Sequence, residues 1–550
     1  MSHEFSTQPQ DELRPGQPAN HSLPPLAPLE LINDASPEQQ RDAAEDESQY
    51  PRGLTKFLII ASVTLVYVLT SMDSSIVSVV VPSLTDEFHT IRDVGWYSAA
   101  YRLCVCSFQF MFGKLYKTYP PKKIFLSSVV FFMVGSIVCA TAKKSAVFVL
   151  GRAVCGFAAS AIMAGGLTLL VLCLPMRKRP LYTGIVGGVS GVSGVASPML
   201  GGAIVDGLGW RWCFWICLPL GFITLLALSF CLPNTKSKQK LTWRERLSQM
   251  DPIGTLCFVA SLTCLFLALS WAGSRYAWRS PLIIGLLVAS GVLLGLFGLD
   301  QWWKGETATL PPRIFKNRSV LSGFTYTMFC NSASMVVLYY LPTYFQFVRG
   351  KTAAQSGYYQ IPAIAGDIIG VILQSTGVTL VGYYTPFMWA GTILMPLLAG
   401  LLTTIKTRTA LVNVLVMTGF FGFSGGIGFL SPQSAVQMAL PKEDASIGLS
   451  IIVFAEQFGA ALFVSAAQNV FQTRLAGNLH DMAPSLNTTS IESAGLTDLR
   501  NLVTPEDVKD VLNAVDQSVA QTWYMAVALS CLTIIGSATM DWRSVKEKKS

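Results

Sequence analysis

The sequence predicts an all-α integral membrane protein with fourteen transmembrane helices. Of its 550 residues, 51% are hydrophobic and only 13% are charged, whereas soluble domains carry roughly 25% charged residues. The apolar residues gather in runs of about 20, each long enough for a helix to cross roughly 30 Å of hydrocarbon. These runs are centred near Val66, Cys104, Phe132, Ala159, Val192, Phe222, Ala260, Val288, Phe329, Asp367, Ile393, Phe420, Phe458 and Leu529.

The distribution of basic residues predicts how these helices are oriented. An even number of spans places both termini on one side, and Lys and Arg are more frequent in and beside the loops on that side. Because basic loops remain on the cytoplasmic side of a membrane, we expect both termini to be cytoplasmic. The net charge of +8 is spread over many short loops, so it indicates no nucleic-acid partner.

Three polar segments lie outside the apolar runs. Residues 1–52 are rich in Pro, Gln, Asp and Glu and contain no apolar core preceded by basic residues; this is typical of a disordered cytoplasmic tail, not of a signal peptide. A long loop, from about 472 to 519, falls on the extracellular side and carries the glycosylation sequon at Asn487. Residues 542–550 form a short basic cytoplasmic tail.

Residue types argue against an enzyme and against a metal site. The four histidines lie outside the predicted spans, so no histidine cluster can bind iron or zinc within the membrane. The twelve cysteines fall almost entirely inside helices, with neither a disulfide framework nor a CxxC pattern. No GxSxG motif or paired intramembrane aspartate stands out. Transport is therefore the leading class of function, and we expect neither a metal nor a cofactor.

Five charged residues lie inside predicted spans. At a rise of 1.5 Å per residue, Asp73, Arg102 and Arg152 share one layer about 10–14 Å below the outer surface. Asp367 and Glu456 fall near the membrane midplane. A charge at such depth costs several kcal/mol unless it is paired or hydrated, so these side chains should face the interior of the bundle.

These charges have structural as well as functional interpretations. Arg152 and Asp73 could form an ion pair that only joins two helices, and the long side chain of Arg102 could extend outward to water. The functional interpretation is proton coupling. Burial raises the proton affinity of a carboxylate and a nearby guanidinium lowers it, so a small movement between the two switches proton binding. Because Arg stays charged, Asp73, Asp367 and Glu456 are the candidate proton carriers.

The fifth predicted helix carries a series of small residues. Glycines recur at three- and four-residue spacing, which favours close approach of another helix, and Pro198 permits a bend. Such a face alone indicates packing. The series is Gly184, Gly187, Gly188, Gly191, Gly194, Ser197, Gly201 and Gly202.

Taken together, several segments resemble the major facilitator superfamily. They are MDSSIVSVVVP (72–82), GKLYKTYPPKK (113–123), GRAVCGFAAS (151–160), SPMLGG (197–202), WRWCFWICLP (210–219), LPPRIFKNRSV (310–320) and YYLPTYFQFVRG (339–350). More narrowly, they are similar to its fourteen-helix drug/proton antiporters, in the fungal branch of toxin and secondary-metabolite efflux pumps. The resemblance covers roughly residues 53 to 541.

This resemblance implies a fold and a mechanism. Two six-helix bundles, 53–232 and 305–541, would face each other about a central cavity, with two inserted helices within 233–304. Rocking of the bundles would give alternating access. The resemblance also implies a small amphipathic substrate, the proton gradient as the energy source, no cofactor, and a monomer in the plasma membrane, with the vacuolar membrane as the alternative.

The resemblance also assigns roles to residues. Arg152 matches the family's arginine on helix 4, which is associated with proton coupling, and Asp73 matches its aspartate on helix 1. The helix 5 antiporter motif corresponds to Gly191, Gly194, Ser197, Pro198, Gly201 and Gly202, and the loop 2–3 motif keeps Gly113, Lys122 and Lys123. Three departures from the family pattern are Lys117 in place of an aspartate, Pro120 in place of a glycine, and Ser197 in place of a glycine.

The predicted function is proton-coupled efflux of small amphipathic molecules such as toxins, secondary metabolites or drugs, which would confer multidrug resistance or export a mycotoxin. An importer, including an iron-chelate transporter, on the same fold is the alternative, and direction of transport separates the two. A membrane sensor that does not transport is a third hypothesis, but the sequence offers no folded signalling domain for it.

Overall fold

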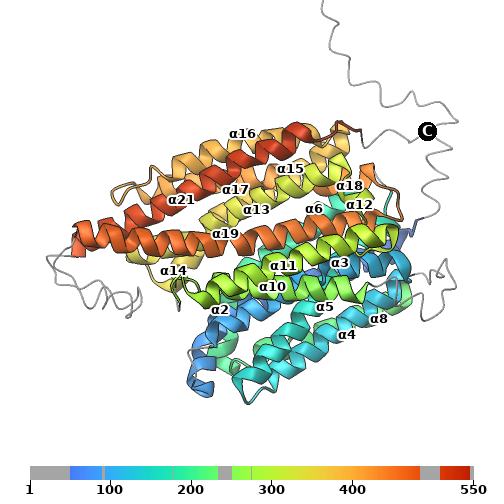
Figure 1. Cartoon of the computed structure of the whole chain (residues 1–550), viewed down its shortest axis with the longest axis horizontal. Helices are drawn as coiled ribbons and strands as arrows, with labels where there is room; N and C mark the ends of the chain where they lie inside the picture. Colours follow the sequence, from blue (N-terminus) through green and yellow to red (C-terminus); the bar gives the residue numbers. More distant parts are fainter. Residues whose placement is uncertain are drawn as a thin grey trace, which may run out of the picture. The chain divides into compact units, whose positions relative to one another are not determined.

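The computed structural model consists almost entirely of long helices (Figure 1). The predicted tail up to residue 49 and the sequon at Asn487 lie outside the residues that the structure describes. The described residues are 50–89, 93–175, 178–232, 251–273, 276–482 and 508–544.

The first six predicted spans form a set of packed helices, which we call the first set. Proline in the first turn starts α4 and α6, where its missing N–H costs no hydrogen bond. The helices of this set are α2 (Gly53–Phe88), α3 (Val94–Thr118), α4 (Pro121–Ala140), α5 (Ser145–Cys173), α6 (Arg179–Leu208), α7 (Trp212–Trp215) and α8 (Cys217–Cys231).

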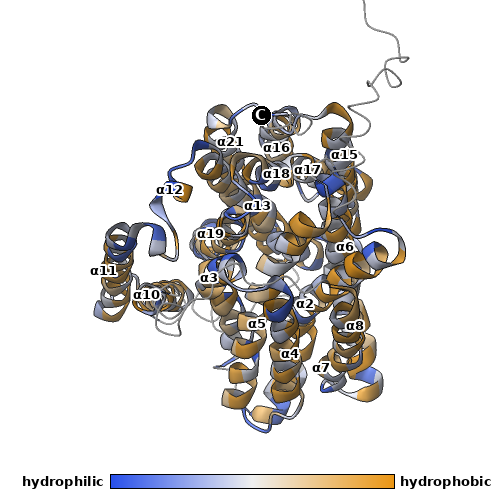
Figure 2. Cartoon of the chain, turned by 90° about the vertical axis from the view of Figure 1, so that its right-hand side faces the viewer, coloured by the Kyte–Doolittle hydropathy of each residue, from blue (hydrophilic) through white to orange (hydrophobic). Residues whose placement is uncertain are grey.

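Two further long helices, the inserted pair, follow the first set. They are α10 (Pro252–Trp271) and α11 (Pro281–Lys304), and a short 3-10 turn, η2 (Gly305–Thr307), and α12 (Pro312–Phe315) connect them to the rest. In Figure 2, which looks along the helices, α10 lies beside α3 and α19, with α11 on its outer side. The inserted pair therefore touches helices of both halves of the chain.

The last six predicted spans form the last set. Its helices are α13 (Arg318–Thr343), the π-helical turn η3 (Tyr344–Val348), α14 (Ala353–Tyr358), α15 (Ile361–Val381), α16 (Thr385–Leu402), α17 (Leu411–Phe429), α18 (Ser431–Ala439), α19 (Ala445–Met482) and α21 (Val508–Thr539).

The helices reach further into the long loop than predicted. We expected the loop from about 472 to 519, but α19 continues to Met482 and α21 begins at Val508. Polar contacts stabilise these extensions after the apolar pattern ends, since the Asn478 amide donates to the Ser518 hydroxyl at 2.8 Å. Apolar periodicity marks the part of a helix that lies in lipid, not the whole helix.

Length and composition identify most of these helices as membrane spans. Among the described residues, eleven helices are long and apolar enough to cross a membrane, or twelve if the two parts of α6, which bend by 40°, form one span. The other two predicted spans are the more polar helices α3 and α13, which have 25 and 26 residues. The described helices are thus compatible with the fourteen expected spans.

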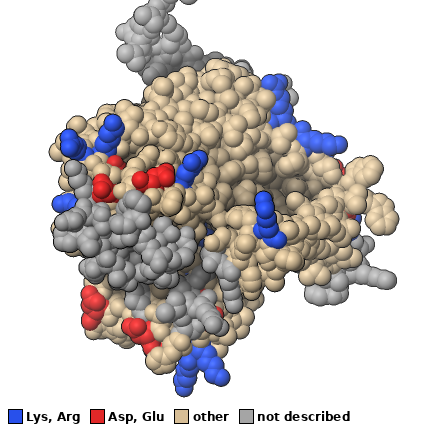
Figure 3. Space-filling view, turned by 60° about the vertical axis from the view of Figure 1, so that its left-hand side comes forward, with Lys and Arg blue, Asp and Glu red and all other residues tan. Residues whose placement is uncertain are grey.

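The outer surface of the helices suits a membrane. Large apolar side chains are exposed on α4, α8, α11 and α16, among them Phe230 at 86% and Trp303 at 91%. Figure 3 shows charged side chains in small separate groups on a face that is otherwise mostly uncharged. Exposed apolar area on this scale would destabilise a soluble protein, so lipid is the medium that covers it.

Contacts between the two sets gather at one end of the helices. We call this end the tail side: it is where α2 begins and α21 ends, and Tyr50 before α2 meets Lys442 before α19 there. One buried apolar cluster joins the sets, and it includes Phe110 of α3 and Phe454 of α19, whose rings are 4.6 Å apart. The other large clusters each lie within one set. The tail side is therefore closed in this structure.

Glycines bring α15 and α17 unusually close. A Cβ at Gly426 would lie 2.9 Å from the carbonyl carbon of Asp367, and one at Gly370 would lie 2.5 Å from the carbonyl oxygen of Phe423. Side chains at these positions would force the two backbones apart, so only glycine permits this spacing. This close contact between α15 and α17, which we call the glycine seam, fixes the backbone of Asp367, one of the predicted site residues.

Candidate functional site

Asp73 on α2 and Arg152 on α5 form a buried ion pair. Arg152 Nη1 donates to Asp73 Oδ2 at 2.7 Å, and both residues are 1% exposed. Arg152 Nε donates to the main-chain oxygen of Tyr97 at 3.0 Å, and its guanidinium lies over the ring of Tyr101. The second carboxylate oxygen of Asp73, Oδ1, has no hydrogen-bond partner among the described residues. The pair is thus neutral overall but leaves one buried acceptor free.

The helix 5 motif lies beside this ion pair. The hydroxyl of Ser197, which replaces the family's usual glycine, donates to the main-chain oxygen of Met72 at 2.9 Å, one residue before Asp73. Gly194 and Gly201 face Ser71 and Ile76 of α2 closely, while Gly202 has only an ordinary contact with α2. In contrast, Gly191 has no neighbouring atom within 4 Å of an added Cβ. The glycine face is therefore only partly used for packing.

Pro198 lies close to the bend that divides α6 into two parts, Arg179–Gly194 and Ala196–Leu208. Its ring removes one backbone hydrogen bond from the helix, which permits such a bend. On the tail side of the bend, Gly188 and Gly184 approach Ile368 and Ser375 of α15. The bend thus follows the part of α6 that contacts the last set.

Asp367 and Glu456 form a second charged site, in the last set. The Asp367 side chain is exposed and that of Glu456 is half-buried, and the two are close enough for their charges to repel. Glu456 accepts a hydrogen bond from the amide of Gln457 at 3.2 Å, and its main-chain oxygen accepts one from Asn331. Among the described residues, no ion pair includes either carboxylate.

Glu456 also faces the first set, since its charge reaches the hydroxyl of Tyr67 on α2. Tyr67 in turn donates to the main-chain oxygen of Met163 at 2.7 Å. Glu456 therefore lies toward the first set, and among the described residues neither Glu456 nor Asp367 has a cation to neutralise it.

Arg102 does not join the ion pair that its predicted depth placed it beside. Its side chain is exposed, and among the described residues it takes part in no ion pair. Depth along a helix does not say which face a residue occupies, and Arg152 faces the Asp73 side while Arg102 does not.

The loop 2–3 motif lies on the tail side. A side chain at Gly113 would lie 2.7 Å from Cβ of Ser450 on α19, so glycine is needed for this contact between the sets. Lys122 donates to the main-chain oxygens of Ser229 and Leu232 at 2.7 Å each, which caps the end of α8. Lys123 is exposed.

Sequence reasoning missed an acidic partner on this side. Lys117 stands where the family has an aspartate, and its ammonium lies 2.6 Å from Asp444, the residue before α19. Arg313 of α12 contacts the other oxygen of Asp444 at 2.8 Å. Burial opposes ionisation of Asp444, but these two cations outweigh it and hold its pKa below the usual range. Lys117 at an expected acidic position was a signal for an acidic partner, but it did not identify Asp444 as that partner.

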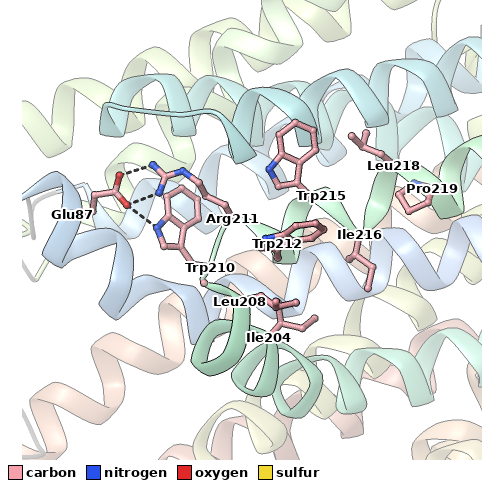
Figure 4. A pocket seen from close by; sticks show the side chains of 11 residues that line it. Glu87, Ile204, Leu208, Trp210, Arg211, Trp212, Trp215, Ile216, Leu218 and Pro219 are labelled. Atoms are coloured by element: carbon pink, nitrogen blue, oxygen red, sulfur yellow. Dashed lines mark hydrogen bonds and ion pairs between the residues drawn. The ribbon is translucent and has the colours of Figure 1, made fainter.

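A pocket opens at the other end of the first set (Figure 4). It has a volume of about 780 Å³ and is lined mainly by apolar side chains, including Leu208 and Trp212, from the ends of α2 and α6 and from α7 and the start of α8. At its edge, Arg211 lies 2.5 Å from Glu87, and the indole of Trp210 donates to Glu87 at 2.9 Å. The bonds from Arg211 hold the pKa of Glu87 below its usual range.

Metal and disulfide chemistry have no visible basis within the part of the chain that the structure describes. No group of three or more His, Cys, Asp or Glu residues there could hold a metal ion. All twelve cysteines are free, and most are buried inside helices.

Comparison with known proteins identifies the family. The family model described as Major Facilitator Superfamily matches residues 63–464. The MFS-type efflux pump MFS1 of Arthroderma benhamiae is 39% identical over 499 residues, which cover 90% of this chain and 93% of that protein. The efflux pump aflT of Aspergillus parasiticus is 37% identical over 512 residues, covering 92% of this chain and 99% of that protein.

A solved structure shows the same fold. The proton:xylose symporter XylE, a member of the same superfamily, matches 86% of this chain and 94% of its own length with a TM-score of 0.54. Its identity of 16% supports the architecture alone. From its sequence, its helices and these relatives, the chain belongs to the major facilitator superfamily of multi-pass membrane transporters, and it is not an enzyme.

Proposed function

We propose that this chain is a proton-coupled efflux pump for small amphipathic organic molecules, working by alternating access. The relatives named above carry the words efflux pump in their names, and they match nearly the whole chain. Another relative is named an aspyridones efflux protein, which favours secondary metabolites and toxins as the substrate class. Transporters of this superfamily generally need no cofactor, and the proton gradient is the proposed energy source.

The observation that carries proton coupling is that two carboxylates inside helices of the last set, Asp367 and Glu456, have no ion-pair partner among the described residues. A carboxylate at such depth without a cation favours binding of a proton, because burial disfavours its charged form. Binding and release of that proton would change the charge between the two sets by one unit. This is the change that a proton-driven conformational cycle needs.

The buried pair of Asp73 and Arg152 has a different proposed role. Its free oxygen, Asp73 Oδ1, would accept a proton if the guanidinium moved away, because burial then favours the neutral carboxyl. In the present structure the guanidinium is in place. We propose that this pair couples movements of α2 and α5 to the proton, while the small residues and Pro198 on α6 permit the movement.

We further propose the following organisation. The bundles comprise residues 53–232 and 305–541, the termini and the tail side are cytoplasmic, the protein is a monomer, and it resides in the plasma membrane. An importer, such as an iron-chelate transporter, uses the same fold, but the names of the relatives favour export.

Efflux-deficient yeast expressing the chain would test this function. We would measure retention of a panel of fluorescent drugs and fungal toxins, with and without an uncoupler, for the wild type and for Asp367→Asn. Lower retention that the uncoupler abolishes, and that Asp367→Asn also abolishes at equal surface expression, is expected. Raised retention would establish uptake instead, and export that persists with the uncoupler would refute proton coupling.

A further inference from the structure

The closed tail side is held by a small network of charges around Asp444. Lys117 comes from α3 of the first set, Arg313 from the linker that follows the inserted pair, and both contact the Asp444 carboxylate. Glu306 pairs with Arg313 at 3.0 Å. A single acid of the last set is thus shared by the first set and by the linker.

The linker itself is held by α3. The ammonium of Lys114, which is 7% exposed, donates to the main-chain oxygens of Thr307 and Ala308, at 2.5 Å for Ala308. A buried ammonium costs free energy unless its donors are satisfied. Main-chain oxygens of the linker satisfy this ammonium, so the position of the 305–310 segment decides whether Lys114 can stay buried.

A buried acid at the base of the inserted pair fixes that segment. Asp251 is fully buried and precedes α10. Its carboxylate accepts hydrogen bonds from Lys304 at 2.5 Å, from Gln301 at 2.7 Å and from the Thr309 hydroxyl at 3.1 Å. Gln301 in turn accepts the amide of Leu310 at 2.7 Å. Asp251 therefore connects the start of α10, the end of α11 and the linker. We call this group of hydrogen-bonded residues the knot: Asp251, Gln301, Lys304 and Thr309.

The backbone geometry and the charge of Asp251 both indicate that its surroundings hold it in one conformation. Asp251 has φ 47°, ψ 64°, a left-handed conformation that costs a non-glycine residue free energy and persists only where the surroundings enforce it. Burial opposes ionisation of Asp251, but the hydrogen bonds from Lys304, Gln301 and the Gly254 amide outweigh it and hold its pKa well below the usual range. The carboxylate is therefore charged at every physiological pH.

The inserted pair also packs across both sets just beside the knot. Phe258 of α10 lies 5.2 Å from Phe110 of α3 and 5.5 Å from Phe454 of α19, measured between ring centroids. On its other side it contacts Phe297 of α11 at 4.8 Å. One helix of the inserted pair thus contacts the two helices that close the tail side.

We propose that the inserted pair is a strut that stabilises the closed tail side, with Asp251 as its positioning residue. Asp251 contacts neither Asp444 nor Lys117. It acts by holding the linker where Thr307 and Ala308 can receive Lys114 and where Arg313 can reach Asp444. The proposal rests on the alternating access of the proposed function. Its test measures closure of the tail side directly and does not require transport.

Accessibility of a cysteine at position 446 would test this strut. Ser446 is 4% exposed, lies at the start of α19 against α3, and its hydroxyl has no hydrogen-bond partner among the described residues, so Ser446→Cys should preserve the interface. We would label the purified full chain in liposomes with a water-soluble maleimide, in a background where exposed Cys531 is replaced by Ser. Labelling without Ser446→Cys gives the background from the eleven remaining cysteines, of which seven are buried and four are partly exposed.

The strut predicts which substitutions speed this labelling. Asp251→Asn removes the charge of the knot but keeps a residue type that tolerates left-handed backbone, and it should raise the labelling rate at position 446 about three- to tenfold. Asp444→Asn should raise it as much or more. The double variant should not add the two effects, since both act on the same closure. Glu87→Gln, which breaks an ion pair at the other end of the first set, should leave the rate unchanged.

A second variant disturbs the knot without changing charge. A Cβ at Gly254 would lie 2.6 Å from Asp300 and 2.7 Å from Gln301, so Gly254→Ala displaces the knot by size alone and should also raise labelling. If Asp251→Asn and Gly254→Ala both label at the wild-type rate while Asp444→Asn labels faster, the strut is refuted. A chain that labels as expected but exports none of the tested compounds would refute the proposed function and leave the strut standing.

Discussion

The two charged sites within the helices differ in how their carboxylates are neutralised. In the first set, Asp73 meets Arg152 at 2.7 Å, and both side chains are almost completely buried. In the last set, neither Asp367 nor Glu456 forms an ion pair among the described residues. One site holds a charge pair that is already balanced, and the other holds charges that only a proton or a cationic ligand could balance.

This difference separates stability from function in a way that can be measured. A buried ion pair is strongly destabilised when one partner is removed, because the other charge is left in an apolar environment. Neutralising a carboxylate that has no ion-pair partner leaves no other charge unpaired. The first site should therefore affect folding as well as transport, whereas the second should affect transport with little effect on folding.

Removing Arg152 should produce the largest effect. Arg152→Gln leaves Asp73 buried without its cation, which should lower the free energy of unfolding by about 3–5 kcal/mol. Thermal unfolding of purified protein would show it. Adding Asp73→Asn should recover much of this stability, because both buried charges are then absent.

The matched control is the ion pair of Glu87 and Arg211, whose side chains are 40% and 38% exposed. Arg211→Gln should cost no more than about 1 kcal/mol, since exposed pairs contribute little. If Arg152→Gln is as mild as Arg211→Gln, the first site is not a buried pair and the comparison between the two sites fails.

The glycine seam behind Asp367 should give the next largest effect. Gly426→Ala places a methyl group against the backbone of Asp367, and overpacking of this kind typically costs about 1–3 kcal/mol. The control is Gly191→Ala, where nothing lies within 4 Å, so alanine should be neutral or stabilise the helix by about 0.5–1 kcal/mol. Equal destabilisation by both substitutions would show that α6 is packed in a way this structure does not describe.

Neutralising Asp367 should barely change stability. Asp367→Asn removes no ion pair, so the free energy of unfolding should stay within about 0.5 kcal/mol of wild type. Export that depends on the proton gradient should nevertheless disappear. A loss of stability like that of Arg152→Gln would show that Asp367 has a structural partner, and the contrast between the two sites would then be wrong.

The fold could be predicted from apolar runs, but the site could be predicted only in part. Each predicted span centre falls inside a long helix because lipid demands an uninterrupted apolar stretch in every span. Asp73 and Arg152 could be paired from their common depth. The position of Arg102 could not, because depth along one helix leaves rotation about its axis undetermined, and rotation is set by packing against neighbours.

Two further features were out of reach for a related reason. Asp444 lies in a short polar segment before α19 and Asp251 before α10, where charged residues are normal and none stands out. Their partners, Lys117 and Lys304, are distant in sequence from Asp444 and Asp251. Only the packing of α3 and α11 against other helices brings each lysine to its aspartate. A residue pattern within a single helix does not predict that packing.

Substitution of Arg102 should have the smallest effect on the free energy of unfolding. It also tests most directly which face of α3 this side chain occupies. Its side chain is exposed and, among the described residues, has no ion-pair partner, so Arg102→Gln should change the free energy of unfolding by less than about 0.5 kcal/mol. Export should also persist, measured by drug retention beside Arg152→Gln at matched expression. Loss of export in Arg102→Gln with normal folding would place Arg102 on the substrate or proton pathway. The layer of Asp73, Arg102 and Arg152 that depth alone predicted would then act as one site in another state of the transport cycle.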